Sequence, residues 1–150
     1  MNFLDQLTED IKSAMKARET QRLQALRGIK KELLEAKTAK GASDELPEAE
    51  IMKILQKMVK QRRDSAQIFI DQNRPELAEV ESAEADVIAT YLPASLTPQE
   101  LEAAVSAIIA KVGATTMKEM GKVMGVASKE LAGKADGKDI SDCVKRLLAN

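Results

Sequence analysis

The apolar residues of this chain recur at the three- and four-residue intervals of amphipathic helices. Over the first 93 residues the pattern predicts four helices. Their apolar stripes are, in chain order, Leu4, Leu7, Ile11 and Met15; Leu23, Leu26, Ile29 and Leu33; Ile51, Ile54, Leu55, Met58, Phe69 and Ile70; and Leu77, Val80, Val87, Ile88 and Tyr91. We expect breaks at residues 17–20, 41–47 and 73–75. No segment of any length alternates with a period of two, so no sheet is predicted.

Residues 93–98 are the expected boundary between two domains, because prolines stand at both ends of this short stretch. At its end, Thr97-Pro98-Gln99-Glu100 has the spacing of a capping box with proline in the first turn, which predicts a helix start. The next apolar stripe is Leu101, Val105, Ile108 and Val112. Gly113 follows as the expected C-terminal cap.

Two more helices are predicted in the remainder of the chain. Thr116 and Glu119 have the spacing of a second capping box, which would open a helix that ends at Gly133. Asp136 is expected to cap a last helix, whose apolar residues are Ile140, Val144, Leu147 and Leu148. The sequence therefore predicts an all-α fold with a four-helix N-terminal region, residues 1–93, and a small C-terminal bundle of three helices, residues 97–150.

Composition excludes several kinds of chemistry. The chain has no histidine and one cysteine, so it lacks a Ser-His or Cys-His nucleophile pair, the usual zinc sites and an internal disulfide. Cys143 is expected to be a buried core residue. Acidic residues near the amino terminus do not resemble a signal peptide, and the longest apolar stretch is too short to span a bilayer. We expect a cytoplasmic protein without a metal, a cofactor or a membrane partner.

Charge is strongly segregated although the net charge is only −1. Residues 12–40 carry nine basic groups against three acidic ones, and residues 53–63 carry five basic groups with no acid. Residues 64–86 reverse this, with seven acidic groups against Arg74 alone. One interpretation is that these helix faces pair with one another on folding; the other is a functional basic surface. The secondary basic surface would comprise Lys57, Lys60, Arg62 and Arg63.

The segment from residue 117 to 131 separates lysines and glycines from apolar residues. On a helical wheel Lys118, Lys122, Gly125 and Lys129 fall within roughly 60°, with Gly121 beside them. The apolar side holds Met117, Met120, Met124, Ala127 and Leu131. Each glycine inside a helix costs about 1 kcal/mol relative to alanine. Two glycines beside a lysine stripe indicate that a negatively charged partner approaches the backbone, unless a neighbouring helix packs against them.

Lys134 and Lys138 extend the candidate surface into the following turn. The helix start near Gly137 offers free backbone N–H groups and a positive dipole end, which favour an anion. Gly133 and Gly137 could also leave the backbone open to close approach, but a helix C-cap and a turn glycine explain them equally well. The lysines likewise have an alternative role as surface groups that keep the protein soluble.

Aromatic residues are only 2% of the chain. A protein that binds single-stranded RNA normally stacks bases on aromatic side chains. If these lysines bind RNA, we therefore expect recognition of a folded RNA by its backbone and shape, with strong salt dependence.

Four stretches resemble YqeY-like proteins and, through them, the helical and tail domains of the GatB subunit of tRNA-dependent amidotransferases. They are Lys57 to Arg63 with Asp64-Ser65, Tyr91-Leu92-Pro93, Met120-Gly-Lys-Val-Met-Gly125 and Gly133-Lys-Ala-Asp-Gly-Lys138. The resemblance covers essentially the whole chain. It implies the part that holds a tRNA, while a separate catalytic portion with ATP and metal amidates the charged amino acid with glutamine as amido donor.

No catalytic motif of such a portion is present here: there is no phosphate-binding loop, metal cluster or Ser-Lys amidase signature. The sequence thus predicts a non-catalytic accessory module that binds tRNA or another structured RNA, acting beside an amidotransferase or an aminoacyl-tRNA synthetase. The alternative is a protein–protein interaction module whose glycine edge docks on a helix of a translation-related partner.

Overall fold

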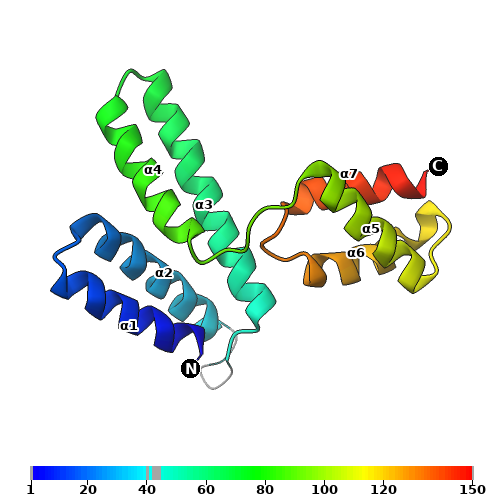
Figure 1. The fold of residues 1–150 in the computed structure, drawn as a ribbon, viewed down its shortest axis with the longest axis horizontal. Helices are drawn as coiled ribbons and strands as arrows, with labels where there is room; N and C mark the ends of the chain where they lie inside the picture. The colour runs from blue at the N-terminus through cyan, green and yellow to red at the C-terminus, as the bar shows by residue number, and fades with distance from the viewer. Residues whose placement is uncertain (1, 40, 42–44, 150) are drawn as a thin grey trace. The chain divides into compact units, whose positions relative to one another are not determined.

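The computed structural model describes residues 2–39, 41 and 45–149, and all regular structure within them is helical (Figure 1). In order these are α1 (Phe3–Lys16), α2 (Thr20–Ala39), α3 (Glu48–Asp71), α4 (Pro75–Ala89), α5 (Pro98–Val112), the 3₁₀ turn η1 (Met117–Glu119), α6 (Met120–Glu130) and α7 (Gly137–Leu148). The predicted all-α class is confirmed. Of the loop expected at 41–47, residues 42–44 lie outside the described residues.

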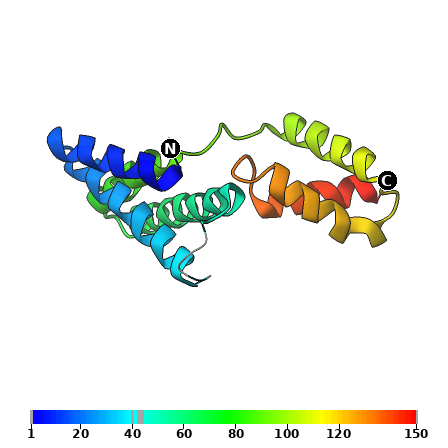
Figure 2. The same cartoon turned by 90° about the horizontal axis from the view of Figure 1, so that it is seen from below.

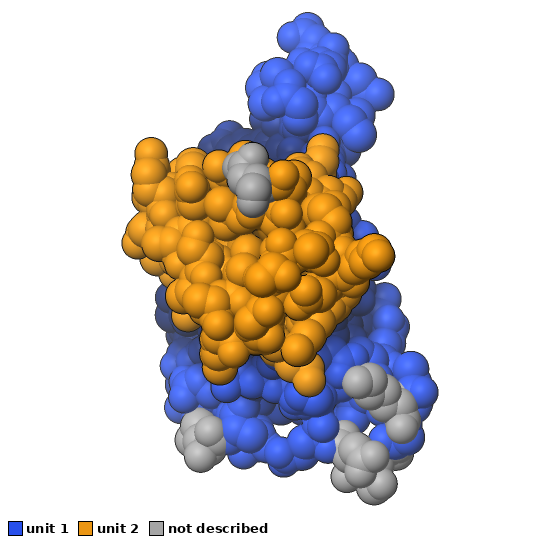
Figure 3. All heavy atoms as spheres, turned by 90° about the vertical axis from the view of Figure 1, so that its right-hand side faces the viewer, with its two compact units in different colours: residues 1–92 blue, residues 93–150 orange. Residues whose placement is uncertain are grey.

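The chain divides into two compact units, residues 1–92 and residues 93–150 (Figure 3). Each unit has its own cluster of buried apolar side chains, and the two clusters share no residue. We describe each unit by itself.

In the N-terminal unit, α1 begins with a capping box that the apolar pattern did not predict. The Asp5 amide donates to the Asn2 side chain at 2.9 Å, and the Asn2 amide donates back to the Asp5 carboxylate at 3.4 Å. The helix ends at Lys16, and Arg18 has a left-handed φ of 57° in the turn to α2. This turn lets α1 and α2 pack side by side, with α2 also packed on α4 (Figure 1).

The core of this unit lies where α1 and α2 meet the N-terminal half of α3 and the C-terminal end of α4 (Figure 1 and Figure 2). Its buried residues are Leu7, Ala14, Leu26, Ile29, Leu33, Ile51, Leu55, Met58 and Ile88. Three residues expected in the apolar stripes are exposed instead: Met15 by 52%, Ile70 by 56% and Val80 by 39%. Met15 is in the last turn of α1, and the other two lie beyond the core on α3 and α4. Ile70 is 12 residues after Met58 and Val80 is eight residues before Ile88, so each lies about 80–120° around its helix from the buried stripe.

The basic and acidic runs of α3 and α4 pair with each other. Arg62 donates to Glu84 at 3.0 Å, and Arg63 donates to Asp86 at 2.9 Å. Lys60 bonds Asp64 within α3 at 3.1 Å. Arg62 and Glu84 are only 21% and 20% exposed, so solvent screens this pair least. Charge segregation in the sequence therefore corresponds in part to ion pairs between two adjacent helices.

Replacing Arg62 with alanine is expected to lower the free energy of unfolding of the N-terminal unit by about 2 kcal/mol. The Glu84 carboxylate would stay partly buried without its partner, and that costs more than losing an exposed pair. The matched control is Arg63→Ala, whose pair is exposed and should contribute less than about 1 kcal/mol. Urea titration of both variants tests this, and equal effects would contradict it.

Tyr91 fixes the end of α4 to α1. Its hydroxyl donates to the Asp10 carboxylate at 2.6 Å, and its ring meets the Phe3 ring edge-on with 5.5 Å between centroids. Burial and the hydrogen bond to Asp10 raise the pKa of Tyr91. Tyr91 and Phe3 therefore stabilise the packing of α1 against the end of α4.

In the C-terminal unit, the capping box at the start of α5 is confirmed. The Glu100 amide donates to Thr97 Oγ1 at 3.1 Å, and the Thr97 amide donates to the Glu100 carboxylate at 3.0 Å. These bonds hold the pKa of Glu100 below its usual value. Gly113 ends the helix with a left-handed φ of 73°, as predicted. Local sequence alone therefore specified both ends of α5.

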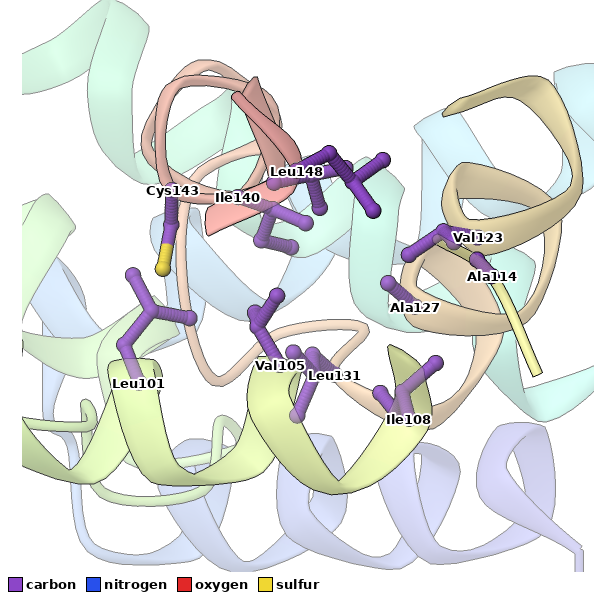
Figure 4. Close-up of a cluster of buried hydrophobic side chains, with 11 residues drawn as sticks. Leu101, Val105, Ile108, Ala114, Val123, Ala127, Leu131, Ile140, Cys143 and Leu148 are labelled. Atoms are coloured by element: carbon purple, nitrogen blue, oxygen red, sulfur yellow. The ribbon is translucent and has the colours of Figure 1, made fainter. Parts of the chain in front are cut away.

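Helices α5, α6 and α7 enclose the second core (Figure 4). Its buried residues are Leu101, Val105, Ile108, Ala114, Val123, Ala127, Leu131, Ile140, Cys143, Val144 and Leu148. Figure 4 shows the Cys143 sulfur pointing from α7 toward Leu101 of α5. Cys143 is buried within this cluster, so the prediction of a core cysteine is confirmed. Burial raises the pKa of its thiol.

The second predicted capping box is wrong. Thr116 makes no capping hydrogen bond, and residues 117–119 form a 3₁₀ turn. The Glu119 carboxylate accepts instead from the amide of Thr115 at 3.3 Å, so its partner is Thr115 rather than Thr116. As a result α6 begins only at Met120, and Met117 is 44% exposed rather than in the core.

Candidate nucleic-acid interface

The candidate surface is built on α6, the shortest α-helix of the C-terminal unit. Val123 and Ala127 point into the core and anchor the helix against α5 and α7. Val123 was missed as a core residue, although its four-residue spacing to Ala127 is a signal for a shared face. With this face buried, Lys122 and Lys129 are exposed. They are seven residues apart and therefore lie on one side of the helix.

The turn after α6 is tightly organised. Gly133 is buried and has a φ of 78°, a conformation that favours glycine. The Leu96 amide, in the segment before α5, donates to the Lys134 carbonyl at 2.9 Å. The left-handed backbone explains why glycine stands at position 133, and its burial makes this backbone unsuited to close approach by a ligand. The hydrogen bond from Leu96 also sets the position of the Lys134 backbone.

The five lysines follow α6 from before its first residue to beyond its last. They are Lys118 in η1, Lys122 and Lys129 on α6, Lys134 in the following turn and Lys138 in the first turn of α7. All five are exposed, and among the described residues none has an acidic side chain within 4 Å. By contrast, Lys111 pairs with Glu130 at 3.0 Å and Arg146 with Glu102 at 3.5 Å. Of the three other cations in this unit, Lys111 and Arg146 are paired, whereas Lys145 on α7 is exposed and without an ion pair in the described residues. The five lysines around α6 are available to a ligand.

Lys118 departs from the arrangement expected on the helical wheel. It lies in the 3₁₀ turn, where residues advance by about 120° rather than 100°, so it stands farther around the axis from Lys122 than the helical wheel gives. The lysines that share a helix face are Lys122 and Lys129. The others extend the surface at the two ends of α6.

Gly121 and Gly125 are exposed, and no atom of the C-terminal unit lies within 4 Å of where a Cβ would stand on either. Packing inside this unit therefore does not explain them. They leave the backbone of α6 bare next to Lys122. The site thus combines positive charge with a place where a ligand can approach the main chain closely.

The start of α7 adds a helix terminus to this surface. Asp136 occupies the N-cap position as predicted, but its side chain makes no capping hydrogen bond. Gly137 is the first helical residue and has no left-handed φ, so the turn-glycine explanation for it is wrong. A Cβ at Gly137 would meet nothing within 4 Å. The N–H groups and dipole at the start of α7 favour an anion beside Lys138, whereas the Asp139 carboxylate in the same turn opposes it.

The secondary basic surface on α3 is less available. Lys60, Arg62 and Arg63 bond Asp64, Glu84 and Asp86, respectively. Lys57 is exposed and has no ion pair within the described ranges. Because three of these four cations are already paired, the lysines around α6 form the stronger candidate.

In the part of the chain that the structure describes, no three His, Cys, Asp or Glu side chains gather in a group that could hold a metal ion. No helix there is long and apolar enough to span a membrane.

A family model described as "Yqey-like protein" matches residues 4–148, nearly the whole chain. The chain belongs to the YqeY-like family. The resemblance identified from the motifs is thus confirmed. Both lysine- and glycine-rich stretches that carried it lie around α6 in the structure of this YqeY-like protein.

A curated relative of this YqeY-like protein is "Altered inheritance of mitochondria protein 41, mitochondrial" of Clavispora lusitaniae (strain ATCC 42720). The two are 39% identical over 90 residues, which is 60% of this chain and 51% of the relative. The match thus spans about half of the relative's length. Its name places that protein in mitochondria, so the cytoplasmic location expected for this chain stays a prediction.

Proposed function

We propose that this protein is a non-catalytic RNA-binding module that holds a structured RNA, such as a tRNA, through the surface around α6. The observation that carries the proposal is the grouping of five exposed lysines along α6 and its two flanking turns, none of them in an ion pair within the described structure. The resemblance to the tail of GatB, which holds a tRNA, supports the same assignment. An amidotransferase or an aminoacyl-tRNA synthetase would then be the protein that acts on the bound RNA.

The binding mechanism is electrostatic. Lys122 and Lys129 contact phosphates from one face of α6, while Lys134 and Lys138 contact them at the turn and at the start of α7. Gly121 and Gly125 let a phosphate backbone come close to the helix. Residues 93–150 contain no aromatic residue, so this unit has no ring on which to stack an unpaired base. Recognition of a folded RNA by its backbone and shape follows.

The proposal predicts salt-sensitive binding of total tRNA. With three phosphate contacts, affinity should fall about 30-fold or more between 50 and 200 mM salt. The triple variant Lys118→Glu, Lys122→Glu, Lys129→Glu should bind about 100-fold more weakly at low salt, because each reversal replaces an attraction by a repulsion. Fluorescence anisotropy of labelled tRNA measures both effects.

The matched control is Lys16→Glu, Lys31→Glu, Lys53→Glu, which changes the net charge equally but on exposed positions of the N-terminal unit. It should retain most of the affinity. Absence of binding by folded wild-type protein at low salt would refute the proposal. Equal losses in the two triple variants would refute the assignment to α6.

A second candidate function uses the same surface for a protein partner. Gly121 and Gly125 lie four residues apart with open space above them, which suits close packing of a helix from another protein. Salt distinguishes the two functions, since an apolar helix contact should keep its affinity between 50 and 200 mM salt.

A further inference from the structure

The α3–α4 hairpin is longer than the helical base on which it packs. The N-terminal core extends along α3 as far as Met58 and Val59, and along α4 from Val87 onward. Farther out, the buried contacts are small: Ala66 on α3 and Ala78 on α4 are each 5% exposed. In Figure 1 the turn that joins α3 to α4 lies well away from α1 and α2. Within the described residues of the N-terminal unit, the distal half of the hairpin is therefore two helices without a third layer.

An apolar face continues from the core onto this distal half. Phe69 is eleven residues after Met58, and Val80 is seven residues before Val87, so each lies on the same side of its helix as a core residue. Phe69 is partly buried and Val80 is 39% exposed. We call Ile68, Phe69, Leu77 and Val80 the distal hairpin face. Ile68, at its edge, is 54% exposed.

The base of this face is hollowed. Where α2 begins against α4, there is an open hollow of about 550 Å³. Its lining residues are Glu19, Thr20, Gln21, Arg22, Ala83 and Val87. Ala83 and Val87 follow Val80 by three and seven residues on α4, so the hollow and the distal hairpin face are continuous. Together they offer the room for an element lying against α4 beyond the start of α2.

The charge of the distal half of the hairpin limits which kind of partner could bind there. Residues 64–81 carry Asp64, Asp71, Glu76, Glu79 and Glu81 against Arg74 alone. Within this stretch Arg74 bonds Glu76 at 2.7 Å, and Lys60 bonds Asp64 at 3.1 Å, so an excess of negative charge remains. Such a surface repels nucleic acid and also a second copy of itself. It attracts a positively charged partner with apolar side chains.

We propose that the distal hairpin face binds a basic amphipathic helix of a partner protein. Such a helix would lie against α3 and α4 as the third layer that they lack, with its apolar side chains on Phe69 and Val80. Its lysine or arginine side chains would face carboxylates beside Val80 on α4, namely Glu76, one turn before it, and Glu79. The inference is independent of the RNA-binding proposal, because it concerns the other unit and the opposite charge.

A synthetic peptide tests this on the full chain. The probe is a fluorescein-labelled helix of about five turns, with leucines at helical spacing and lysines elsewhere. A peptide of the same composition with scrambled order keeps the charge but has no apolar face. Anisotropy should show binding of the amphipathic peptide at least about tenfold tighter than binding of the scrambled one.

The variant Ile68→Ser, Val80→Ser should weaken that binding about tenfold or more, because it removes two exposed apolar contacts. Met15→Ser, Leu34→Ser is the matched control, since both side chains are exposed apolar groups elsewhere in the same unit. It should bind as the wild type does. Circular dichroism confirms that both variants keep their helices.

Several outcomes would overturn the proposal: no binding of the amphipathic peptide, equal binding of the scrambled one, or equal affinity of the two serine variants. Sedimentation showing that wild-type chains associate through Ile68 and Val80 would assign the face to a second copy instead. The Ile68→Ser, Val80→Ser variant should bind tRNA as the wild type does. Failure of one proposal is therefore distinguishable from failure of the other.

Discussion

Replacing Leu26 with alanine is expected to lower the free energy of unfolding of the N-terminal unit by about 3 kcal/mol. Leu26 is fully buried in α2 at the centre of the core shared by α1, α2, α3 and α4. Removing its isobutyl group loses burial of apolar surface and leaves a cavity that packed helices close only in part. The C-terminal unit should keep its stability, because its buried cluster shares no residue with this one.

The measurement uses the single tyrosine of a chain without tryptophan. Tyr91 belongs to the N-terminal unit, so its fluorescence during a urea titration reports that unit, while circular dichroism reports both. Leu26→Ala should move the tyrosine transition to lower urea. The matched variant Val105→Ala, in the fully buried core of the other unit, should leave that transition in place. One transition that shifts equally in both variants would show that the units unfold together and contradict the prediction.

The double variant Gly121→Ala, Gly125→Ala is expected to stabilise the C-terminal unit by about 2 kcal/mol and to weaken tRNA binding about tenfold. Alanine favours the helix by about 1 kcal/mol at each site, and the added Cβ atoms meet no atom of that unit. The same methyl groups would hold an RNA backbone away from α6. An effect in opposite directions on folding and on binding is the signature of glycines kept for a ligand.

Thermal unfolding and tRNA anisotropy on the same samples measure the two effects. Gly113→Ala is the control, because its φ of 73° makes alanine unfavourable by about 1 kcal/mol or more. It should destabilise the unit without changing its RNA affinity once folded. Stabilisation by Gly121→Ala, Gly125→Ala with unchanged tRNA binding would remove the glycines from the proposed interface.

Local signals in the sequence predicted most of the helix boundaries. Thr97 and Glu100 formed the expected capping box, Gly113 took the left-handed conformation, and α4 begins at Pro75 after the expected break. Such signals work because capping bonds and left-handed turns involve residues only a few positions apart. The second capping box failed for the same local reason, since Thr115 competes with Thr116 for the Glu119 carboxylate.

Periodicity could not predict which apolar side chains are buried. Phe69 is eleven residues after Met58 and so on the same side of α3, yet Met58 is buried in the core and Phe69 is not part of it. The difference is whether α2 reaches them, and that depends on how far one helix extends along another. For the same reason the sequence showed segregated charge but not the Arg62–Glu84 bond, which joins residues 22 positions apart.

The sequence by itself predicted the all-α class, the boundary at Pro93 and Pro98 before the last three α-helices, and the lysines and glycines around α6 as candidate groups. These follow from residue type and spacing. The tertiary structure decided which of those groups are available. It left the five lysines around α6 without ion pairs in the described residues, and it paired three of the four cations of the secondary basic surface. It also gave Gly133 a backbone role while leaving Gly121 and Gly125 open. Availability depends on distances between residues far apart in the chain, and only packing sets those distances.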